Sequence, residues 1–375
     1  MKTRASILRQ APGKFETAVL DLEGPRPNEV MVKVAASGLC HSDDHLATGD
    51  LPVPVMPIAG GHEGAGVVQE VGSAVMGIKE GDHVVFSFLP SCGHCRWCAS
   101  GQQNLCDLGA GLLQGSRWED PTDFRLKLAG TDTPVGQMCG ISTFVETTTV
   151  SADSAVKVDD DLPLDKVCLL GCNVGTGWGS AVNSAQVQPG HTVIVMGIGG
   201  VGINAIQGAS HAGAANVIAV DPIAMKRENA QQVGATHGVE TMEEATELAK
   251  SFTNGQGADS AIITVGIIKP EYVGQAMASI RKAGTVVVTA LGNIADTTPL
   301  PVSLADVTLF QKRIQGSLFG ESNPNWDILR QVELYRSGVL KLDEVITKTY
   351  KLDQIAQGYQ DMHDGKNQKG VVVFD

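Results

Sequence analysis

The amino-acid sequence predicts an α/β protein with two domains, a barrel-like β domain followed by a doubly wound parallel sheet. Its 375 residues exceed what one small core accommodates. Valine-rich runs separated by Gly/Pro turns fill residues 1–90, whereas strands alternate with helices from about residue 174 onward. Glycine, at 44 residues, and aromatic residues, at only 5%, favour twisted sheets with tight turns over a helical bundle.

Three valine-rich runs are the predicted strands of the β domain: EVMVKVAASG (29–38), GAGVVQEVG (64–72) and GDHVVFSF (81–88). We expect no helix of any length in this part of the chain. A polar, irregular stretch at about 107–139 is expected to form a long surface loop.

Alternating elements define the second domain. The predicted strands are HTVIVM (191–196), NVIAVD (216–221), ADSAIITVG (258–266) and TVVVTALG (285–292). The predicted helices are 201–213, 224–234 and 271–284. This order is typical of a parallel sheet built from βαβ units. The alternation stops after about residue 317, so the expected domains are 1–173 with 317–375, and 174–316 between them.

Charge and hydropathy exclude several classes of partner. The net charge is −13 and no run of Lys/Arg stands out, which argues against nucleic acid and anionic membranes. No uninterrupted apolar stretch has the length of about 18 residues that suggests a membrane-spanning helix. The start, MKTRASILRQ, lacks the apolar core of a signal peptide. We therefore expect a cytoplasmic protein.

A glycine-rich turn marks a candidate dinucleotide site. The segment VMGIGGVGINA (195–205) follows a predicted strand and opens a predicted helix, and it fits G-x-G-x-x-G with one extra glycine. Its glycines are Gly197, Gly199, Gly200 and Gly202. Such a turn lets the backbone approach a pyrophosphate at a helix N-terminus. A glycine-rich turn in an unrelated α/β domain is the alternative.

Two residues extend this interpretation. Asp221 lies 19 residues after Gly202, at the end of the second strand, where a carboxylate accepts hydrogen bonds from both ribose hydroxyls. Its charge would repel a 2′-phosphate, so NAD is favoured over NADP. Lys226 is a candidate for holding the adenosine ribose, with a solvated helix lysine as the alternative.

Eight cysteines are present, and a long chain without an export signal favours metal binding over disulfides. Four of them follow the pattern C-x2-C-x2-C-x7-C, and these are Cys92, Cys95, Cys98 and Cys106. Two-residue gaps let consecutive thiolates surround one ion, and four thiolates complete a tetrahedral shell. The pattern predicts a structural zinc site, with an iron–sulfur cluster as the competing interpretation.

Three further residues are candidates for a second metal site. Cys40 lies in GLCHSDDH, His62 in GHEGAG and Cys172 in GCNVGTGWGSA. Taken singly, each residue is equally compatible with a buried thiol or a histidine bonded to a turn. Cys139 and Cys168 lie outside both patterns, and core packing is expected for Cys168.

These motifs together resemble the zinc-containing alcohol dehydrogenases of the medium-chain type over essentially the whole chain. The motifs that carry the resemblance are GLCHSDDH, GGHEGAG, CGHCRWC with Cys106, GCNVGTGWGSA, GIGGVG and VDPIAMKR. The resemblance implies a GroES-like β-barrel catalytic domain, with a zinc lobe at about 92–106, and a Rossmann NAD-binding domain. CDLGAGLL, QKRIQGSLFG, NPNWDI and LDQIAQGYQDMHDGKN are similar to the nicotinoprotein-type subgroup, which is assayed with N,N-dimethyl-4-nitrosoaniline and thought to retain its cofactor.

The resemblance also implies roles for single residues. Cys40, His62 and Cys172 bind a catalytic zinc, leaving a fourth position open. Asp43 accepts a hydrogen bond from His62, and Glu63 is a nearby carboxylate that approaches the metal.

Five further roles concern the proton path and the cofactor. Ser42 takes the alcohol proton and passes it, through the cofactor ribose, to His45 near solvent. His41 faces the cofactor phosphates where relatives often carry Arg, and Thr176 and Val201 line the nicotinamide pocket.

The implied function is oxidation of an alcohol to an aldehyde, or the reverse, with two zinc ions per subunit and NAD. A thiol-adduct formaldehyde dehydrogenase or a formaldehyde dismutase on the same scaffold is an alternative, as is a non-catalytic protein that binds zinc and NAD. A sheet edge near 312–319 is expected to pair two copies, which predicts a homodimer or homotetramer.

Overall fold

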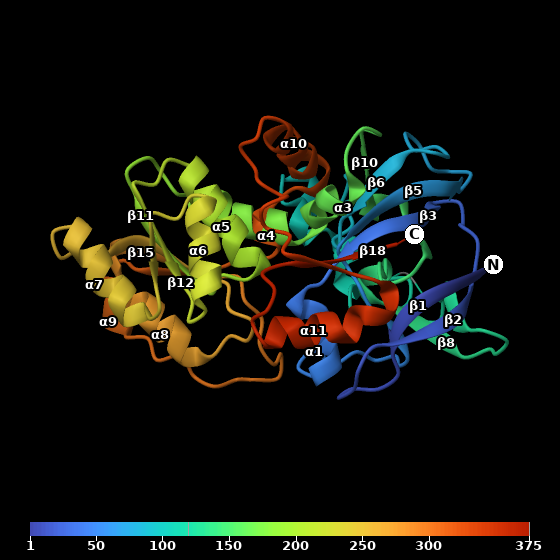
Figure 1. Cartoon of the computed structure of the whole chain (residues 1–375), viewed down its shortest axis with the longest axis horizontal. Coiled ribbons are helices and arrows are strands. Elements are labelled where there is room, and N and C mark those ends of the chain that lie inside the picture. Colours follow the sequence, from blue (N-terminus) through green and yellow to red (C-terminus); the bar gives the residue numbers. More distant parts are fainter. Residues whose placement is uncertain (119, 375) are drawn as a thin grey trace. The chain divides into compact units, whose positions relative to one another are not determined.

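In the computed structural model the chain divides into two compact units (Figure 1). Unit 1 comprises Met1–Cys172, Asn323–Leu334 and Ile346–Asp375, and unit 2 comprises Asn173–Ser322 and Tyr335–Val345. The structure describes residues 1–118 and 120–374. A β-barrel with a further sheet in unit 1 and a parallel sheet in unit 2 confirm the predicted fold class.

A closed barrel forms one part of unit 1. Its strands, in order, are β1 (Lys2–Leu8), β2 (Glu16–Leu22), β7 (Leu126–Leu128), β8 (Pro134–Gln137) and β4 (Ile58–Ala59). The expectation of a surface loop over 107–139 is wrong, because β7 and β8 from this stretch complete the barrel.

Buried charges explain why this stretch looks like a loop. Arg125 is only 2% exposed, and its Nε lies 2.8 Å from Glu29 Oε2. Arg117 Nε lies 2.5 Å from the other oxygen of Glu29. Burial alone would raise the pKa of Glu29, but the two guanidinium groups lower it below its ordinary value. The polar residues of this stretch therefore do not mark a surface loop, because its arginines are paired inside the fold.

A second sheet of unit 1 carries the three strands expected from the sequence, here β3 (Glu29–Gly38), β5 (Gly64–Val71) and β6 (His83–Phe86). The strand order is β10–β6–β5–β3–β18–β17, and β9 also pairs with β3. The remaining bounds are β9 (Thr147–Ser151), β10 (Ala155–Val158), β17 (Lys348–Tyr350) and β18 (Gly370–Val373). The end of the chain therefore lies beside β3, as the red β18 and blue β3 show in Figure 1.

Short helices complete unit 1, and one of them contradicts the expectation that the first 90 residues contain none. The helices are α1 (His41–Thr48), α2 (Arg96–Ala99), α3 (Leu164–Val167) and α11 (Ile355–His363), while α10 (Pro324–Arg336) begins in unit 1 and ends in unit 2. The buried face of α1 includes Asp43, Asp44 and His45. An apolar periodicity is absent because polar side chains occupy that face.

Unit 2 contains a six-stranded, fully parallel sheet in the order β13–β12–β11–β14–β15–β16. The bounds are β11 (Thr192–Met196), β12 (Asn216–Val220), β13 (His237–Val239), β14 (Ala258–Ile263), β15 (Ile280–Val288) and β16 (Arg313–Gly316). Every residue of β11 is buried, so both faces of this central strand are covered, as is usual for parallel sheets.

The helices of unit 2 are α4 (Asn173–Gly179), α5 (Gly200–His211), α6 (Ala224–Gln232), α7 (Met242–Phe252), α8 (Pro270–Ser279) and α9 (Leu304–Leu309). The predicted helix 271–284 is too long, since β15 begins at Ile280. The sequence analysis also missed α7 and β13. No helix in the described part of the chain has both the length and the apolar character needed to cross a membrane.

The expected domain boundaries, which place 1–173 and all of 317–375 in the first domain, differ from these units at residue 173, at 317–322 and at 335–345. The segment 335–345 belongs to unit 2 partly through Gln207, which is buried in α5. The Gln207 side chain accepts from Lys341 N at 2.8 Å and donates to Lys341 O at 3.1 Å.

Candidate metal and cofactor sites

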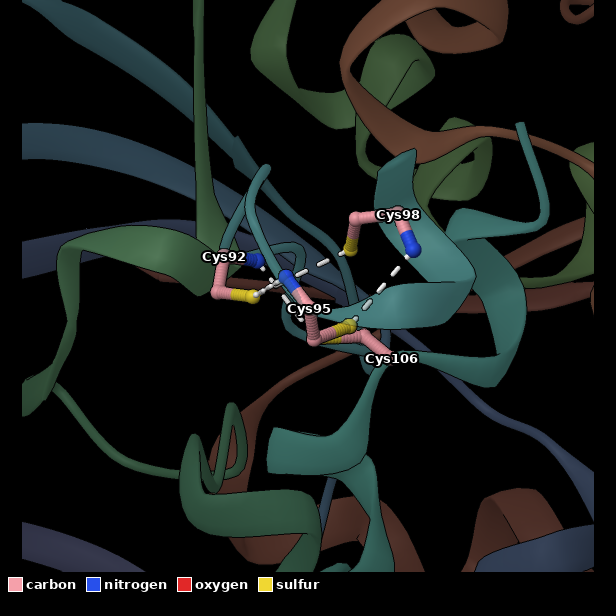
Figure 2. Close-up of side chains that lie close together, drawn as sticks. All are labelled: Cys92, Cys95, Cys98 and Cys106. Carbon is pink, nitrogen blue, oxygen red and sulfur yellow. Dashed lines mark hydrogen bonds between the residues drawn. The ribbon is translucent and has the colours of Figure 1, made fainter. Parts of the chain in front are cut away.

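The four clustered cysteines converge on one point of unit 1 (Figure 2). Their Sγ atoms all lie within 4.8 Å of one another, and the Cys92–Cys98 and Cys95–Cys106 pairs are each 3.9 Å apart. Backbone N–H groups point at the sulfurs, including Cys95 N to Cys92 Sγ at 3.3 Å. Hydrogen bonds from backbone N–H groups lower the pKa of Cys95 to about 6.

This arrangement fits a single tetrahedral ion. Zinc–thiolate bonds of about 2.3 Å in a tetrahedron place the sulfurs about 3.8 Å apart, close to the 3.9 Å found here. A cluster of several iron and sulfide atoms would require the cysteine sulfurs to stand farther apart. The geometry thus favours zinc over an iron–sulfur cluster.

A second group of ligand-type side chains assembles from distant parts of unit 1. Cys40, His62 and Cys172 are all buried, and their ligand atoms also lie within 4.8 Å of one another. Cys40 is the residue before α1, His62 precedes β5, and Cys172 follows a short 3-10 turn. The contact between Cys172 Sγ and His62 Nε2 is 3.3 Å, and a shared tetrahedral zinc would set about 3.6 Å.

Asp43 fixes the far side of His62. Its Oδ2 lies 2.9 Å from His62 Nδ1, which is an ion-pair distance. The ring N–H is not well aligned with this oxygen for a hydrogen bond. Its Oδ1 accepts a 2.7 Å hydrogen bond from Gly61 N. Nδ1 thus faces a carboxylate while Nε2 faces the thiols, the arrangement usual for a histidine that binds a metal.

The electrostatics of this site favour a cation. A hydrogen bond from Cys172 lowers the pKa of Cys40 well below its ordinary value and raises that of Cys172 well above. Burial alone would lower the pKa of His62, but Asp43 and the two thiols raise it well above its ordinary value. The surroundings thus stabilise a thiolate, the metal-binding form of cysteine, at Cys40, and the negative charge of Cys40 and Asp43 favours positive charge between them.

Glu63 does not belong to this ligand group. Its buried carboxylate forms an ion pair with Lys369 Nζ, and both side chains are at most 2% exposed. Lys369 Nζ also donates to Leu39 O at 2.8 Å. One ammonium group therefore connects the residue after His62 with the residue before Cys40.

The first turns of α1 carry the other residues expected near this site. Ser42 Oγ lies 3.9 Å from Cys40 Sγ. The His41 and His45 rings lie 6.4 Å apart. The expectation that His45 is near solvent is wrong, because its side chain is 5% exposed; its Nδ1 lies 3.6 Å from Asp50 Oδ2, which is 26% exposed.

In unit 2, the glycine-rich turn follows β11 and opens α5 as expected. Gly197 has φ 90°, and a Cβ there would lie 2.7 Å from Val265 backbone atoms. A Cβ on Gly202 would lie 2.0 Å from Gly197 O, whereas one on Gly199 meets open space. Gly200 is the first residue of α5, and no side chain caps this helix. Its N-terminus therefore suits an anion.

Asp221 holds the glycine-rich turn to the end of β12. Its Oδ2 accepts from Ile198 N at 2.8 Å and its Oδ1 from Ile223 N at 2.9 Å. Each oxygen retains a further lone pair for a ribose hydroxyl. Lys226 lies in the first turn of α6, the helix that follows.

Thr176 lies on α4 and Val201 lies on α5, and the two helices pack closely against each other at these residues. A Cβ on Gly177 would lie 2.1 Å from Val201 O. Thr176 O accepts a 2.6 Å hydrogen bond from Ser180, the first residue of a π-helical turn (Ser180–Ser184). Such turns are frequent at functional sites.

The sequence analysis missed several residues that hold these sites. Thr264 Oγ1 donates to Gly197 O at 2.7 Å and so fixes the glycine-rich turn. Ser37 and Thr143 hydroxyls both reach Glu63 O, at 2.9 and 3.2 Å. No local signal identifies them, because each partner lies at least 26 residues away in the chain.

Two family descriptions match the chain. "Alcohol dehydrogenase GroES-like domain" matches residues 26–160. This range includes every residue of the two ligand groups of unit 1 except Cys172. "Zinc-binding dehydrogenase" matches residues 200–332, most of which lie in unit 2.

Proteins that are similar over their full length are also named as dehydrogenases. "Putative alcohol dehydrogenase D" of Mycobacterium tuberculosis is 52% identical over 373 residues, covering 100% of both chains. "NDMA-dependent alcohol dehydrogenase" of Amycolatopsis methanolica is also 52% identical, covering 100% of this chain and 99% of the relative. "S-(hydroxymethyl)glutathione dehydrogenase" of Paracoccus denitrificans is 33% identical, covering 100% of both.

Among solved structures, benzyl alcohol dehydrogenase of Acinetobacter calcoaceticus has a TM-score of 0.91. It is 29% identical, and the match covers 100% of both chains.

Proposed function

Because this chain belongs to the zinc-dependent alcohol dehydrogenase family, we propose that it oxidises alcohols to aldehydes, and the reverse, with zinc and a nicotinamide cofactor. The observation that carries the proposal is the buried group of Cys40, His62 and Cys172 with Asp43 behind the imidazole. When bound, zinc would act as a Lewis acid on the alcohol oxygen and the nicotinamide would accept the hydride.

The protein's own residues prepare this chemistry. Cys40, His62 and Cys172 would hold the catalytic ion and, as three ligands, leave a fourth position for the substrate. Asp43 keeps the His62 ring oriented with Nε2 toward the thiols. Burial of all three ligands excludes water and strengthens the electrostatic interactions inside the site.

We propose a proton path along α1. Ser42, 3.9 Å from Cys40 Sγ, would accept the alcohol proton. His45 would take up the proton next, and Asp50, 3.6 Å away and partly exposed, leads from His45 toward the surface. A pH–rate profile of His45→Ala identical to that of the unmodified protein would exclude this path.

A second, structural zinc is proposed at Cys92, Cys95, Cys98 and Cys106. Four thiolates leave no position for substrate, so this ion would fix the surrounding segment without taking part in the reaction. Its support is the pair of 3.9 Å sulfur separations.

NAD is the proposed cofactor. The support is the uncapped N-terminus of α5, the open space beside Gly199, and the Asp221 carboxylate at the end of β12. A carboxylate there accepts the ribose hydroxyls and repels the additional phosphate of NADP. Lys226, His41, Thr176 and Val201 complete the proposed cofactor contacts.

We also propose that NAD stays bound between turnovers, as the similarity to the NDMA-dependent relative suggests. The test compares benzyl alcohol oxidation by desalted protein with added NAD and with the nitroso acceptor alone. We expect turnover with the acceptor and no added NAD. Turnover only with added NAD would show a dissociating cofactor and leave the zinc and hydride assignments intact.

Formaldehyde-specific activity is less well supported, since the glutathione-adduct dehydrogenase is only 33% identical. A formaldehyde dismutase remains an alternative on the same scaffold. A non-catalytic role conflicts with retention of Cys40, Ser42, His45, His62 and Cys172 together.

The proposed assembly is a homodimer or homotetramer. All residues of β16 at the sheet edge are exposed, and nearby α9 exposes Leu304 and Leu309 by 82% and 74%. A second copy would pair this edge and cover these side chains. Sedimentation velocity tests this assembly.

Reduced cysteines in both metal sites favour a cytoplasmic location.

A further inference from the structure

An aromatic cluster in unit 1 connects to the turns that bear Cys40 and His62. It consists of Phe15, Phe144 and Tyr359, which are 6%, 0% and 5% exposed. Phe15 stacks on Tyr359 and meets Phe144 edge-on, both at 5.7 Å between ring centroids. Tyr359 lies in α11, within the motif LDQIAQGYQDMHDGKN, to which the proposed reaction gives no role.

Tyr359 contacts the Cys40 turn through its hydroxyl. Its Oη donates to Cys40 O at 3.3 Å, across 319 residues of sequence. The preceding residue permits this approach, because a Cβ on Gly358 would lie 2.3 Å from Leu39 Cδ1. A buried tyrosine hydroxyl needs a partner, and here the partner is the carbonyl of a proposed metal ligand.

Phe15 and Phe144 contact the turn that presents His62. A Cβ on Gly60 would lie 2.5 Å from Phe15 and 2.9 Å from Phe144. Phe144 N also donates to Gly60 O at 3.0 Å. One aromatic cluster therefore contacts both turns, through the Tyr359 hydroxyl at Cys40 and through the two phenylalanine rings at Gly60, although Cys40 and His62 lie 22 residues apart in sequence.

We infer that Tyr359 is a positioning residue, which sets the Cys40 turn relative to His62 so that the two ligands meet one zinc ion. This inference rests on the proposed metal site. The rings supply the common support, and the hydroxyl fixes the peptide that follows Cys40. Phenylalanine would pack equally well in the cluster, so the hydroxyl is the part of the side chain that acts on the site.

Tyr359→Phe removes only this hydroxyl, and Cys40 O keeps its hydrogen bond from Asp43 N. The measurements are zinc retained against graded chelator, and the visible absorption of cobalt placed at the catalytic site. We expect the catalytic zinc to bind about three- to tenfold more weakly, the loss that one neutral hydrogen bond gives. The cobalt bands should shift, and the Cys92 cluster should keep its zinc unchanged.

Tyr350→Phe is the matched control. Tyr350 is also buried and C-terminal, but its hydroxyl bonds to Asp361 and Asn367, neither of which is a proposed metal ligand. Unchanged zinc affinity and cobalt bands in Tyr359→Phe would overturn the inference, as would equal weakening of both zinc ions or an equal effect of the control. An unmodified protein holding zinc only at the Cys92 cluster would instead refute the proposed function.

Discussion

The two cysteine sites of unit 1 are built in opposite ways. The Cys92 cluster comes from the 15 residues 92–106, with Cys92 and Cys95 only half-buried. The ligands of the other site span 40–172, and all three are buried. In the first site, neighbouring residues supply N–H groups to the sulfurs. In the second, side chains from distant segments orient the ligands.

The difference agrees with the proposed division of roles between a structural and a catalytic ion. A local site forms wherever its segment closes around an ion, and its full set of thiolates suits stabilisation. An assembled site forms only after several segments have folded, and its incomplete ligand set suits catalysis. Variants that affect one site and spare the other test this division.

The largest expected effect concerns activity. Cys172→Ala should lower kcat/KM by about a thousandfold or more, roughly 4 kcal/mol of transition-state stabilisation, because the Lewis acid is lost. Steady-state kinetics and metal analysis provide the measurement. Cys168→Ala is the control, because it removes a buried thiol four residues earlier that is outside the ligand group. Comparable activity in the two variants would refute the assignment of Cys172.

An effect of similar size, but on stability and not on activity, is expected from the local site. Cys98→Ala should remove the Cys92-cluster zinc and lower the free energy of unfolding by about 3–5 kcal/mol, as loss of a structural metal does. Folded protein that retains the catalytic zinc should remain active. Chemical denaturation gives the measurement, with Cys139→Ala as the control for a buried thiol outside both sites. An unchanged zinc content in Cys98→Ala would rule out this role.

The smallest expected effect concerns the side chains that contact a ligand in each of the two sites. Asp43→Asn should weaken zinc at the assembled site by about 10- to 100-fold, because the carboxylate that faces His62 Nδ1 is lost. Ser91→Ala removes a hydroxyl 3.9 Å from Cys98 Sγ and should change zinc binding far less. Competition with a chelator measures both. Equal effects would mean that the assembled site does not depend more strongly on its surroundings.

The sequence predicted the fold best where residues follow a simple period. β3, β5 and the strands β11, β12, β14 and β15 of unit 2 were found because their buried positions are mostly apolar. Helix α1 was missed because its buried face is polar, and polar burial often marks a functional site. The strands β7 and β8 were missed because they are short and follow arginines that are paired with Glu29 inside the fold.

The sites follow the same rule. Spacing alone identified the Cys92 cluster, whereas Cys40, His62 and Cys172 needed the family resemblance. Lys369 and Tyr359 escaped both, since their partners lie more than 300 residues away and nothing local marks them. Long-range contacts of this kind become visible only when the chain is folded.

The pairing of β18 with β3 has a consequence for biosynthesis. Leu39 N donates to Gly370 O, and Leu39 O accepts from Lys369, so residues synthesised more than 300 positions later complete the turn that carries Cys40. The Cys92 cluster has no such dependence on the C-terminus for its ligands, and its zinc can load while the ribosome is still elongating the chain. The group of Cys40, His62 and Cys172 should therefore reach its final form only after residues 369 and 370 have been synthesised.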